Sequence, residues 1–272
     1  GGKMVCHYCG YETAGVQNCP SCGSPYIGGF RAGTQQIEEL VKRQFPQARV
    51  LRMDLDTTKN KGGHEKILAQ FADEEADIMI GTQMIVKGHD FPNVTLVGVL
   101  AADMSLYSDD YRSGERTFQL LTQAAGRAGR GRSKGEVVIQ TYSPDHYSIQ
   151  MAAKQDYEGF YEKEMNYRDL MGYPPAAQLM AVLMTGADEE MLQTAAEYLK
   201  KYAIRVMDEG TCQVIGPASP YVGKVNDVYR KILYLKSEDY QMLIRIKNHM
   251  ERYIEINRGF ANMRIQFDFN PM

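Results

Sequence analysis

The chain has 272 residues, of which 44% are hydrophobic and 24% charged, and its formal net charge is −3. This composition suits a globular protein with room for two modest domains. The balanced charge excludes a broad basic surface, so any contact with nucleic acid must use a local basic patch. No run of about 18 apolar residues occurs, so no membrane span is expected.

Four cysteines near the start of the chain form two Cys-x-x-Cys pairs, Cys6 with Cys9 and Cys19 with Cys22. Four thiolates in two tight turns suit a tetrahedral zinc ion with a structural role. Disulfides or free buried thiols are the alternatives. The N-terminus carries no export signal, which favours zinc and a cytoplasmic setting. Residues 1–27 are therefore predicted to form a partial zinc-binding segment, and Cys212 to be an ordinary core residue.

Residues 28–150 alternate helical and strand patterns. Apolar residues recur at helical spacing in three stretches, and short apolar runs separate them. Helices that alternate with apolar strands predict a parallel sheet covered on both faces. The expected helices are Thr34–Phe45, Gly63–Asp73 and Ser113–Gly126, and the expected strands are Ala48–Met53, Asp77–Ile80, Val94–Ala101 and Glu136–Thr141.

Residues 151–176 are predicted to be a helical connector between two domains, and the helical stretch itself is expected to run from Pro144 to Met171. Gly172 and the two prolines after Tyr173 end this stretch. Its expected buried stripe comprises Tyr157, Phe160, Tyr161, Met165 and Leu170.

Residues 177–272 follow the order β-α-β-β-α-β, which is typical of a ferredoxin-like α+β domain. The expected helices are Glu189–Met207 and Asp239–Tyr253. The expected strands are Leu179–Thr185, Cys212–Ile215, Arg230–Lys236 and Met263–Phe269.

The first of two motor-like segments follows the strand that ends at Ile80. Gly81 allows another backbone to approach, and the Thr82 hydroxyl can hold a nucleic-acid phosphate at the carboxyl end of the strand. Further along, Gly88 permits an unusual backbone angle, and Asp90 could accept from a ribose hydroxyl. A simple strand-to-loop transition is the alternative.

The second segment reads Gln123-Ala-Ala-Gly126-Arg127-Ala-Gly-Arg130-Gly. Two arginines three residues apart share one helical face. Arginine stabilises the charge that grows on a transferring γ-phosphoryl group, a contribution of about 10³- to 10⁵-fold in rate. The alternative is a glycine-rich basic turn on the surface, which the specific Gln-x-x-Gly-Arg-x-Gly-Arg spacing disfavours.

These two segments resemble motifs V and VI of superfamily 2 helicases, and Gly33-Thr34-Gln35 resembles the motif IV region of the same proteins. With the cysteine pairs and the Tyr173-Pro174-Pro175 run before the last domain, nearly the whole chain is similar to the C-terminal part of the PriA family of replication-restart helicases. The resemblance implies that residues 28–150 are the RecA-like second lobe of an ATP-dependent helicase.

The same resemblance implies roles for individual residues. Arg127 and Arg130 would face the ATP γ-phosphate across a cleft between two lobes, and Gln123 would couple nucleotide to DNA. Gly88, Asp90 and Gly126 would lie near the nucleotide, and Gly81, Thr82 and Lys87 would contact nucleic acid.

The family further implies 3′-to-5′ DNA unwinding in replication restart and primosome assembly at stalled or recombined forks. The implied partners are forked and single-stranded DNA, single-stranded-DNA-binding protein and other primosome proteins. The resemblance also implies a family pattern of eight cysteines that hold two zinc ions, of which only the last four, Cys6, Cys9, Cys19 and Cys22, are present in this sequence. These four could regroup around one ion or stay empty.

Two ATP-binding elements are missing from the sequence. No Gly-x-x-x-x-Gly-Lys-[Ser/Thr] loop occurs, because Gly223-Lys224 is followed by Val225. The acidic run at Asp73 precedes a strand instead of following one, so it is expected to be a turn. ATP with Mg²⁺ is therefore expected to need the N-terminal half of a helicase, and this chain alone to lack useful ATPase activity.

Two other functions compete with the motor. One is a non-motor DNA-binding scaffold that uses the zinc segment and the last domain, and the other is lobe 2 of an RNA helicase. Aromatic and basic residues around one strand of the last domain could stack bases and hold phosphates, or form an ordinary strand edge. They are Tyr221, Lys224, Tyr229, Arg230 and Lys231.

Overall fold

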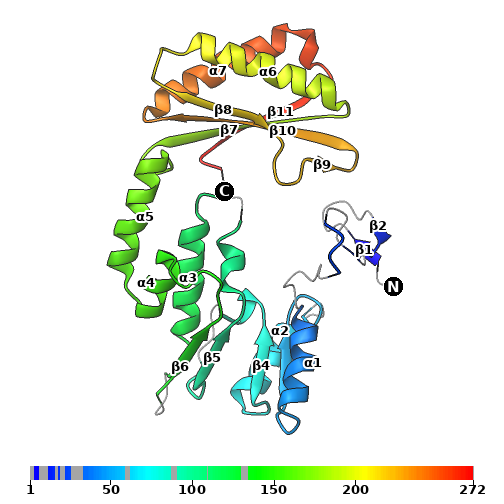
Figure 1. Cartoon of the computed structure of the whole chain (residues 1–272), viewed down its shortest axis with the longest axis vertical. Coiled ribbons are helices and arrows are strands. Elements are labelled where there is room, and N and C mark those ends of the chain that lie inside the picture. The colour runs from blue at the N-terminus through cyan, green and yellow to red at the C-terminus, as the bar shows by residue number, and fades with distance from the viewer. Residues whose placement is uncertain are drawn as a thin grey trace. The chain divides into compact units, whose positions relative to one another are not determined.

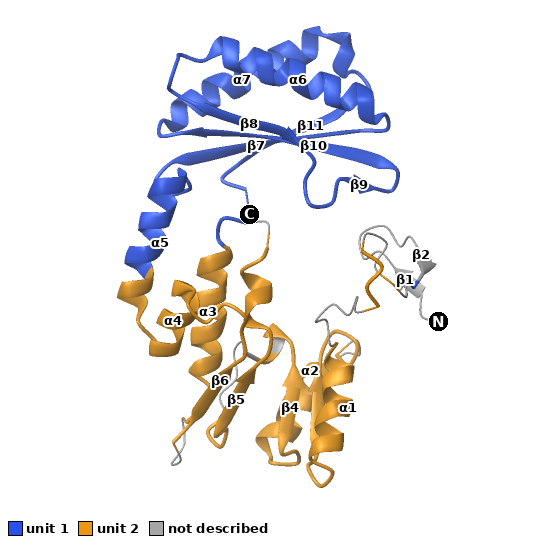
Figure 2. Ribbon diagram, viewed as in Figure 1, with its two compact units in different colours: residues 1–16, 109–112, 161–272 blue, residues 17–108, 113–160 orange. Residues whose placement is uncertain are grey.

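The computed structural model of the chain divides into two compact units, shown in different colours in Figure 2. Unit 1 comprises residues 1–16, 109–112 and 161–272, and unit 2 comprises residues 17–108 and 113–160. The structure describes residues 3–5, 12–15, 18, 22–25, 33–58, 62–86, 91–108, 110–129 and 134–271. Within these ranges, no helix combines the length and the apolar character needed to cross a membrane.

Unit 2 contains the alternating helices and strands that the sequence predicts, each within a few residues of its expected bounds. Two short 3₁₀ helices, η1 and η2, are additional. The elements are α1 (Thr34–Gln44), β3 (Val50–Met53), α2 (Gly63–Ala72), β4 (Ile78–Gly81), η1 (Gln83–Val86), β5 (Leu96–Val99), η2 (Ala102–Ser105), α3 (Ser113–Ala125), β6 (Glu136–Ile139) and α4 (Tyr147–Lys154).

The strands of unit 2 form two parallel pairs (Figure 1). β3 pairs with β4, and β5 pairs with β6. A helix connects the strands of each pair, α2 in the first and α3 in the second, as parallel strands require. Parallel pairing is therefore confirmed. The single continuous sheet is not found, because no ladder joins the two pairs in the described part of unit 2.

Each strand pair of unit 2 has its own apolar cluster. Met53, Leu68 and Phe91 are buried beside β3 and α2. Phe118 of α3 and Phe160 are buried in the other cluster, with stacked rings whose centroids lie 4.1 Å apart. α3 is thus fixed by its own apolar face in unit 2.

The connector differs from the prediction of one long helix with an aromatic stripe. It consists of α4 and α5 (Tyr157–Met171), and the break lies at Gln155, which has a φ of 55°. On α5 the buried positions are Phe160, Glu164 and Arg168, whereas Leu170 is 84% exposed. The expected stripe is therefore confirmed at Phe160 and wrong at Tyr157, Tyr161 and Leu170, which are exposed. A hydrogen-bonded ion pair, Arg168 Nε to Glu164 Oε1 at 2.7 Å, occupies the rest of the inner face instead.

Unit 1 contains the β-α-β-β-α-β order that the sequence predicts, with a short extra strand, β9. Its strands run in the order β11-β7-β10-β8, all antiparallel, and β9 pairs with β10. The elements are β7 (Gln178–Gly186), α6 (Glu189–Val206), β8 (Gln213–Ala218), β9 (Lys224–Val225), β10 (Val228–Ser237), α7 (Tyr240–Ile256), η3 (Arg258–Phe260) and β11 (Arg264–Phe269).

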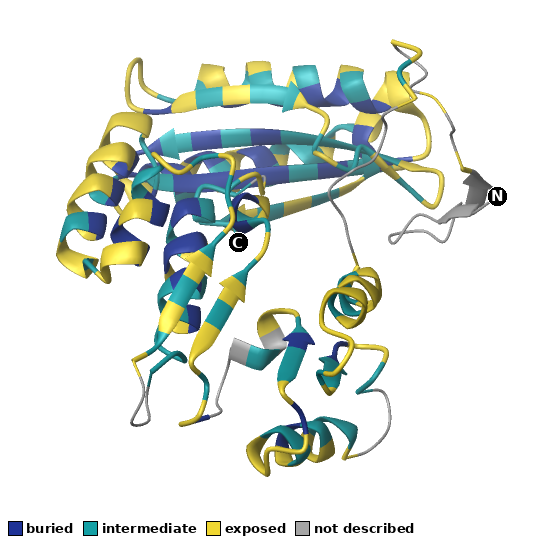
Figure 3. Ribbon diagram, turned by 60° about the horizontal axis from the view of Figure 1, so that its bottom comes forward, coloured by how far each residue is buried: buried dark blue, intermediate teal, exposed yellow. Residues whose placement is uncertain are grey.

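The core of unit 1 lies between this sheet and the two long helices. Figure 1 shows α6 and α7 on one face of the sheet, and Figure 3 shows the buried positions of the central strands. Leu199 of α6, Leu233 of β10 and Leu243 of α7 are fully buried there. Cys212 is buried in the same cluster, which confirms it as a core residue. The N-terminal strands β1 (Lys3–Val5) and β2 (Glu12–Ala14) form an antiparallel pair.

Candidate functional site

At the carboxyl ends of the paired strands β3 and β4, polar groups of α1 and of the turn after β3 come together. Asp54 directly follows β3, and its Oδ2 accepts a hydrogen bond of 2.5 Å from the hydroxyl of Thr34 at the start of α1. Its Oδ1 accepts from the backbone N–H groups of Asp56 and Thr57 at 3.0 and 2.9 Å. The hydrogen bond from Thr34 is the largest cause that holds the pKa of Asp54 below its usual value. Asp54 is thus an ionised, oriented carboxylate.

Gly81 is the last residue of β4, at the same end of this strand pair. A Cβ on Gly81 would lie 2.6 Å from the backbone oxygen of Met53 and 2.5 Å from Ile85 Cγ2. The close backbone approach expected at Gly81 is therefore present, and the approaching backbone is that of β3. Thr82 follows with an exposed side chain. The contact of both residues with nucleic acid remains a prediction.

The arginine segment lies at the end of α3. Gly126 N–H donates to the carbonyl of Thr122 at 2.9 Å, and Arg127 N–H donates to Ala124 at 3.0 Å. The bond of Arg127 reaches three residues back instead of four, so a hydrogen-bonded turn follows the end of α3 at Ala125. The Arg127 side chain is half-buried, whereas Gln123 is exposed.

Two glycines fix the backbone after Arg127. Gly129 has a φ of +74°, and its N–H donates to the carbonyl of Val94, just before β5, at 3.0 Å. A Cβ on Gly129 would lie 2.5 Å from the backbone nitrogen of Gly135, just before β6. The arginine segment therefore packs backbone to backbone against the amino ends of β5 and β6.

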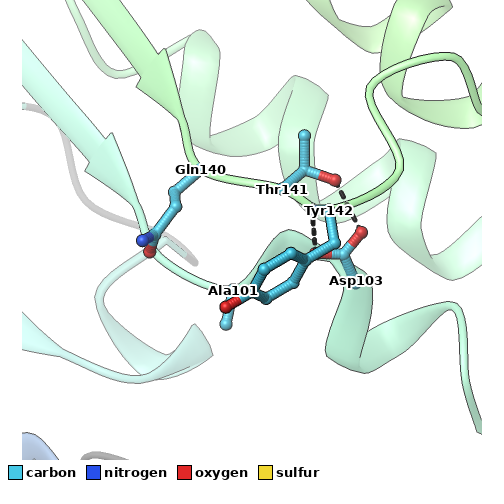
Figure 4. Close-up of a pocket in the computed structure, with 5 residues that line it drawn as sticks. All are labelled: Ala101, Asp103, Gln140, Thr141 and Tyr142. Carbon is cyan, nitrogen blue, oxygen red and sulfur yellow. Dashed lines mark hydrogen bonds between the residues drawn. The ribbon is translucent and has the colours of Figure 1, made fainter. Parts of the chain in front are cut away.

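The carboxyl ends of β5 and β6 carry a second polar cluster, around Asp103 (Figure 4). The buried Asp103 carboxylate accepts from the Thr141 hydroxyl at 2.6 Å and from the N–H groups of Tyr142 and Ser143 at 2.9 and 3.1 Å. Burial alone would raise the pKa of Asp103, but these hydrogen bonds outweigh burial and hold its pKa below the usual value. The cluster borders a cavity of about 170 Å³. It lies at the opposite end of the strand pair from the arginine segment.

Two models of known protein families match this chain. Residues 29–132 match the helicase conserved C-terminal domain, and residues 169–272 match the primosomal protein N C-terminal domain. The replication restart protein PriA of Bacillus subtilis is 44% identical over 100% of this chain and 34% of its own length. PriA of Synechocystis is 39% identical over 97% of this chain and 31% of the Synechocystis protein. PriA of Chlamydia pneumoniae is 36% identical over 99% of this chain and 36% of the Chlamydia protein.

The chain belongs to the PriA family. It spans about a third of the length of these PriA relatives. The helicase match covers the part of unit 2 in which Thr34, Gly81 and Arg127 lie, and the second match covers most of unit 1.

Several predicted site residues of this PriA-family chain lie outside the described residues. They are Cys6, Cys9, Cys19, Lys87, Gly88, Asp90 and Arg130. Cys22 is described and exposed. The described residues include no group of three or more His, Cys, Asp or Glu side chains that could hold a metal ion. Zinc and nucleotide ligation therefore stay predictions.

The basic and aromatic residues around β9 and β10 are partly paired with each other and with acids. Lys224 lies 2.9 Å from Asp227 and 4.7 Å from the centre of the Tyr229 ring. Lys231 lies 3.5 Å from Glu189. Carboxylates beside two of these lysines lower the net charge of the strand, which weakens its case as a phosphate-binding patch.

Asp54 and Asp103 are the polar residues that the sequence analysis missed. Asp54 directly follows the last residue of β3, and Asp103 follows the last residue of β5 by a few positions. A threonine donates to each carboxylate, Thr57 through its backbone N–H to Asp54 and Thr141 through its hydroxyl to Asp103. This position at the edge of a parallel pair is where α/β proteins place ligand-binding groups, so strand ends alone could have indicated both.

Proposed function

We propose that this chain supplies the second, RecA-like motor lobe and the C-terminal domain of an ATP-dependent 3′-to-5′ DNA helicase that acts in replication restart and primosome assembly. Arg127 and Arg130 complete an ATP site whose phosphate-binding loop and Mg²⁺ ligand are supplied from outside this chain. The similarity to replication restart proteins along the whole chain supports the restart role. The match of residues 29–132 to helicases supports the motor.

The observation that carries the motor proposal is the fixed backbone of Arg127. A hydrogen bond to the carbonyl of Ala124 holds its N–H, and the contact between Gly129 and Gly135 fixes the chain two residues further on. An arginine that stabilises a transferring phosphoryl group must be positioned before the reaction, because reorganisation during the reaction would cost rate. A solvated basic turn would need no such support.

Three further features belong to the proposal. Unit 1 contains a ferredoxin-like domain, which is supported by the strand order β11-β7-β10-β8 with both helices on one face. A structural zinc ion is bound by Cys6, Cys9, Cys19 and Cys22. The pairing of β1 with β2 supports the zinc site, because the connection between these strands contains Cys6 and Cys9. Forked DNA, single-stranded DNA, single-stranded-DNA-binding protein and other primosome proteins are the proposed partners.

The test replaces Arg127 with alanine in a full-length PriA-type helicase that contains this chain. The rate of DNA-stimulated ATP hydrolysis should fall by about 10³-fold or more, because the negative charge on the transferring γ-phosphoryl group loses a guanidinium partner. Arg116→Ala is the matched control, since Arg116 is exposed and lies on α3, the helix that ends just before Arg127. An Arg127→Ala protein with the turnover of the Arg116→Ala protein would refute the motor proposal. Stimulation by duplex RNA in preference to forked DNA would favour the RNA-helicase alternative.

A further inference from the structure

The sheet of unit 1 has one face that α6 and α7 do not cover (Figure 1). Side chains alternate between the two faces along each strand, so the chain neighbours of the core residues Met184 and Leu233 point to this second face. Leu179 and Ala181 are buried at one end of it, whereas the positions toward Thr185 are half-buried or exposed. We call this less buried part the outer face. Its residues are Leu183, Thr185, Arg230, Ile232, Tyr234 and Arg264.

Two arginines lie in one row across the outer face. The strand register places Arg230 of β10 opposite Thr185 of β7, and Arg264 of β11 opposite Thr185 on its other side. Paired residues of neighbouring strands have their side chains on the same face, and neighbouring strands lie about 4.8 Å apart. The backbones of the two arginines are therefore about 10 Å apart, with one threonine between them.

Neither of these guanidinium groups has an acceptor among the residues that the structure describes. No hydrogen bond or ion pair joins the side chain of Arg230 or Arg264 to any of them. Lys231, the neighbour of Arg230 that points to the helical side of the sheet, lies 3.5 Å from Glu189. The fold thus pairs the cation on the helical side and leaves two positive charges on the outer face.

The strands themselves supply no acid near this row. β7, β8 and β10 contain no Asp or Glu, and the one acid of β11 is Asp268. Asp268 is four residues from Arg264, which is about 13 Å along a strand. Two like charges in one row repel each other, so the row does not stabilise the sheet. An anionic ligand is the partner that the row lacks.

An apolar row lies beside the arginine row. Ile232 of β10 is opposite Leu183 of β7, and both side chains are half-buried. Ile232 is two residues from Arg230, about 7 Å along the strand. The next position of β10 on the same face is Tyr234, which is also half-buried. Positive charge, an apolar strip and an aromatic ring therefore follow one another along the central strand β10.

This order of surfaces fits the chemistry of a nucleic-acid single strand. The phosphates of a single strand attract cations, and its unpaired bases pack their flat faces on apolar and aromatic side chains. A duplex hides its base faces, so it would use only the arginine row. A four-stranded antiparallel sheet with both helices on one face is also the arrangement in which RNA-recognition motifs bind single strands on the free face.

We propose that the outer face of the unit 1 sheet is a binding site for single-stranded DNA. Arg230 and Arg264 hold the phosphates. The bases pack on Leu183 and Ile232 and stack on Tyr234. This inference rests on the proposed function, in which single-stranded DNA is a partner, and it assigns that partner to named residues within unit 1.

The test measures the affinity of this chain for a short, fluorescently labelled oligothymidine by anisotropy over a series of salt concentrations. One phosphate contact with a single strand contributes about 0.7 to the slope of log association constant against log salt. Arg230→Gln and Arg264→Gln should each reduce the slope by about 0.7 and weaken binding about 5-fold at ~0.1 M salt. Arg205→Gln is the matched control, because Arg205 is an exposed arginine on α6, outside the sheet.

Two further measurements separate stacking from charge. Tyr234→Leu keeps an apolar side chain and should weaken binding by about 5-fold or more, with an unchanged salt slope, because only a stacked base is lost. Photo-crosslinking of the wild-type chain to an oligonucleotide that contains iododeoxyuridine needs no variant to fold. Mass spectrometry should place a crosslink on β10.

Several outcomes would overturn the inference. Equal affinities and salt slopes in Arg230→Gln, Arg264→Gln and Arg205→Gln would do so, as would crosslinks that lie only in unit 2. Tighter binding of a duplex, with the same losses in the arginine variants, would replace the single strand by a duplex. None of these measurements uses ATP, so they leave the motor untouched. An Arg127→Ala helicase with unchanged turnover would instead refute the proposed function itself.

Discussion

Replacing Gly129 with alanine tests the fixed backbone of the arginine segment. Gly129 has a φ of +74°, which costs a residue with a Cβ about 1–2 kcal/mol. The new Cβ would also lie 2.5 Å from the nitrogen and 2.9 Å from the Cα of Gly135. Both are backbone atoms, so a rotamer change cannot relieve the contact, and the segment must shift by about 0.9 Å to bring the 2.5 Å separation to an ordinary contact of 3.4 Å.

Gly62 provides a matched control for this substitution. It also lies in unit 2 and has a φ of +79°, but a Cβ there would meet nothing within 4 Å. Gly62→Ala should therefore lower the free energy of unfolding only by the cost of the positive φ, about 1–2 kcal/mol. Gly129→Ala should lower the free energy of unfolding by roughly 3 kcal/mol or more, because the strain of the tight contact adds to the cost of the positive φ.

The functional consequence of Gly129→Ala should exceed its effect on stability. A misplacement of about 1 Å can cost on the order of 100-fold in rate, so kcat of the full-length helicase should fall by about that factor. Urea unfolding monitored by circular dichroism gives the free energies, and DNA-stimulated ATP hydrolysis gives kcat. If Gly129→Ala matched Gly62→Ala in both measurements, the backbone contact would not position the arginines.

Three further predictions concern the other clusters. Thr34→Val should lower stability by about 1–2 kcal/mol and raise the pKa of Asp54. Because the pKa of Asp54 is lowered in the folded state, its carboxylate stabilises the fold above pH ~3.9, the ordinary pKa of an aspartate. This stabilisation is lost as the pH falls through the lower pKa of the folded state. Thr34→Val should therefore unfold in acid at a higher pH than wild type. Arg168→Met should cost about 3–5 kcal/mol in urea unfolding by stranding the buried Glu164, and a loss below ~1 kcal/mol would contradict a buried pair. Mass spectrometry should find about one zinc ion per chain, and Cys22→Ser should weaken its retention against a chelator, while equal retention would contradict ligation by Cys22.

Elements with strong apolar periodicity could be predicted from the sequence. α3 and α6 have one apolar face each, so their spans agree with the prediction to within one residue. The connector could not be predicted in the same way. Its inner face carries Glu164 and Arg168, and charged residues are rarely buried without a partner that only the folded chain supplies.

The residues of the proposed motor site form a recognisable motif in the sequence, whereas the backbone contacts around them leave no sequence pattern. The spacing of Gln123, Arg127 and Arg130 indicated phosphate chemistry, whereas nothing in the spacing indicates that Gly129 meets Gly135. The same holds for Arg230 and Arg264, which the strand register places on either side of Thr185. Contacts between residues distant in sequence are decided by the fold and leave no local pattern.

The most direct measurement of the central claim is the affinity of the full-length helicase for a transition-state analogue of ATP hydrolysis, ADP with aluminium fluoride, with and without Arg127→Ala. A group that acts on the transferring phosphoryl group should bind the analogue far more strongly than it binds ATP. The account predicts that Arg127→Ala weakens the analogue by about 100-fold or more and ATP by only a few-fold. An equal loss for both ligands, or none for either, would contradict the placement of Arg127 at the reacting phosphate.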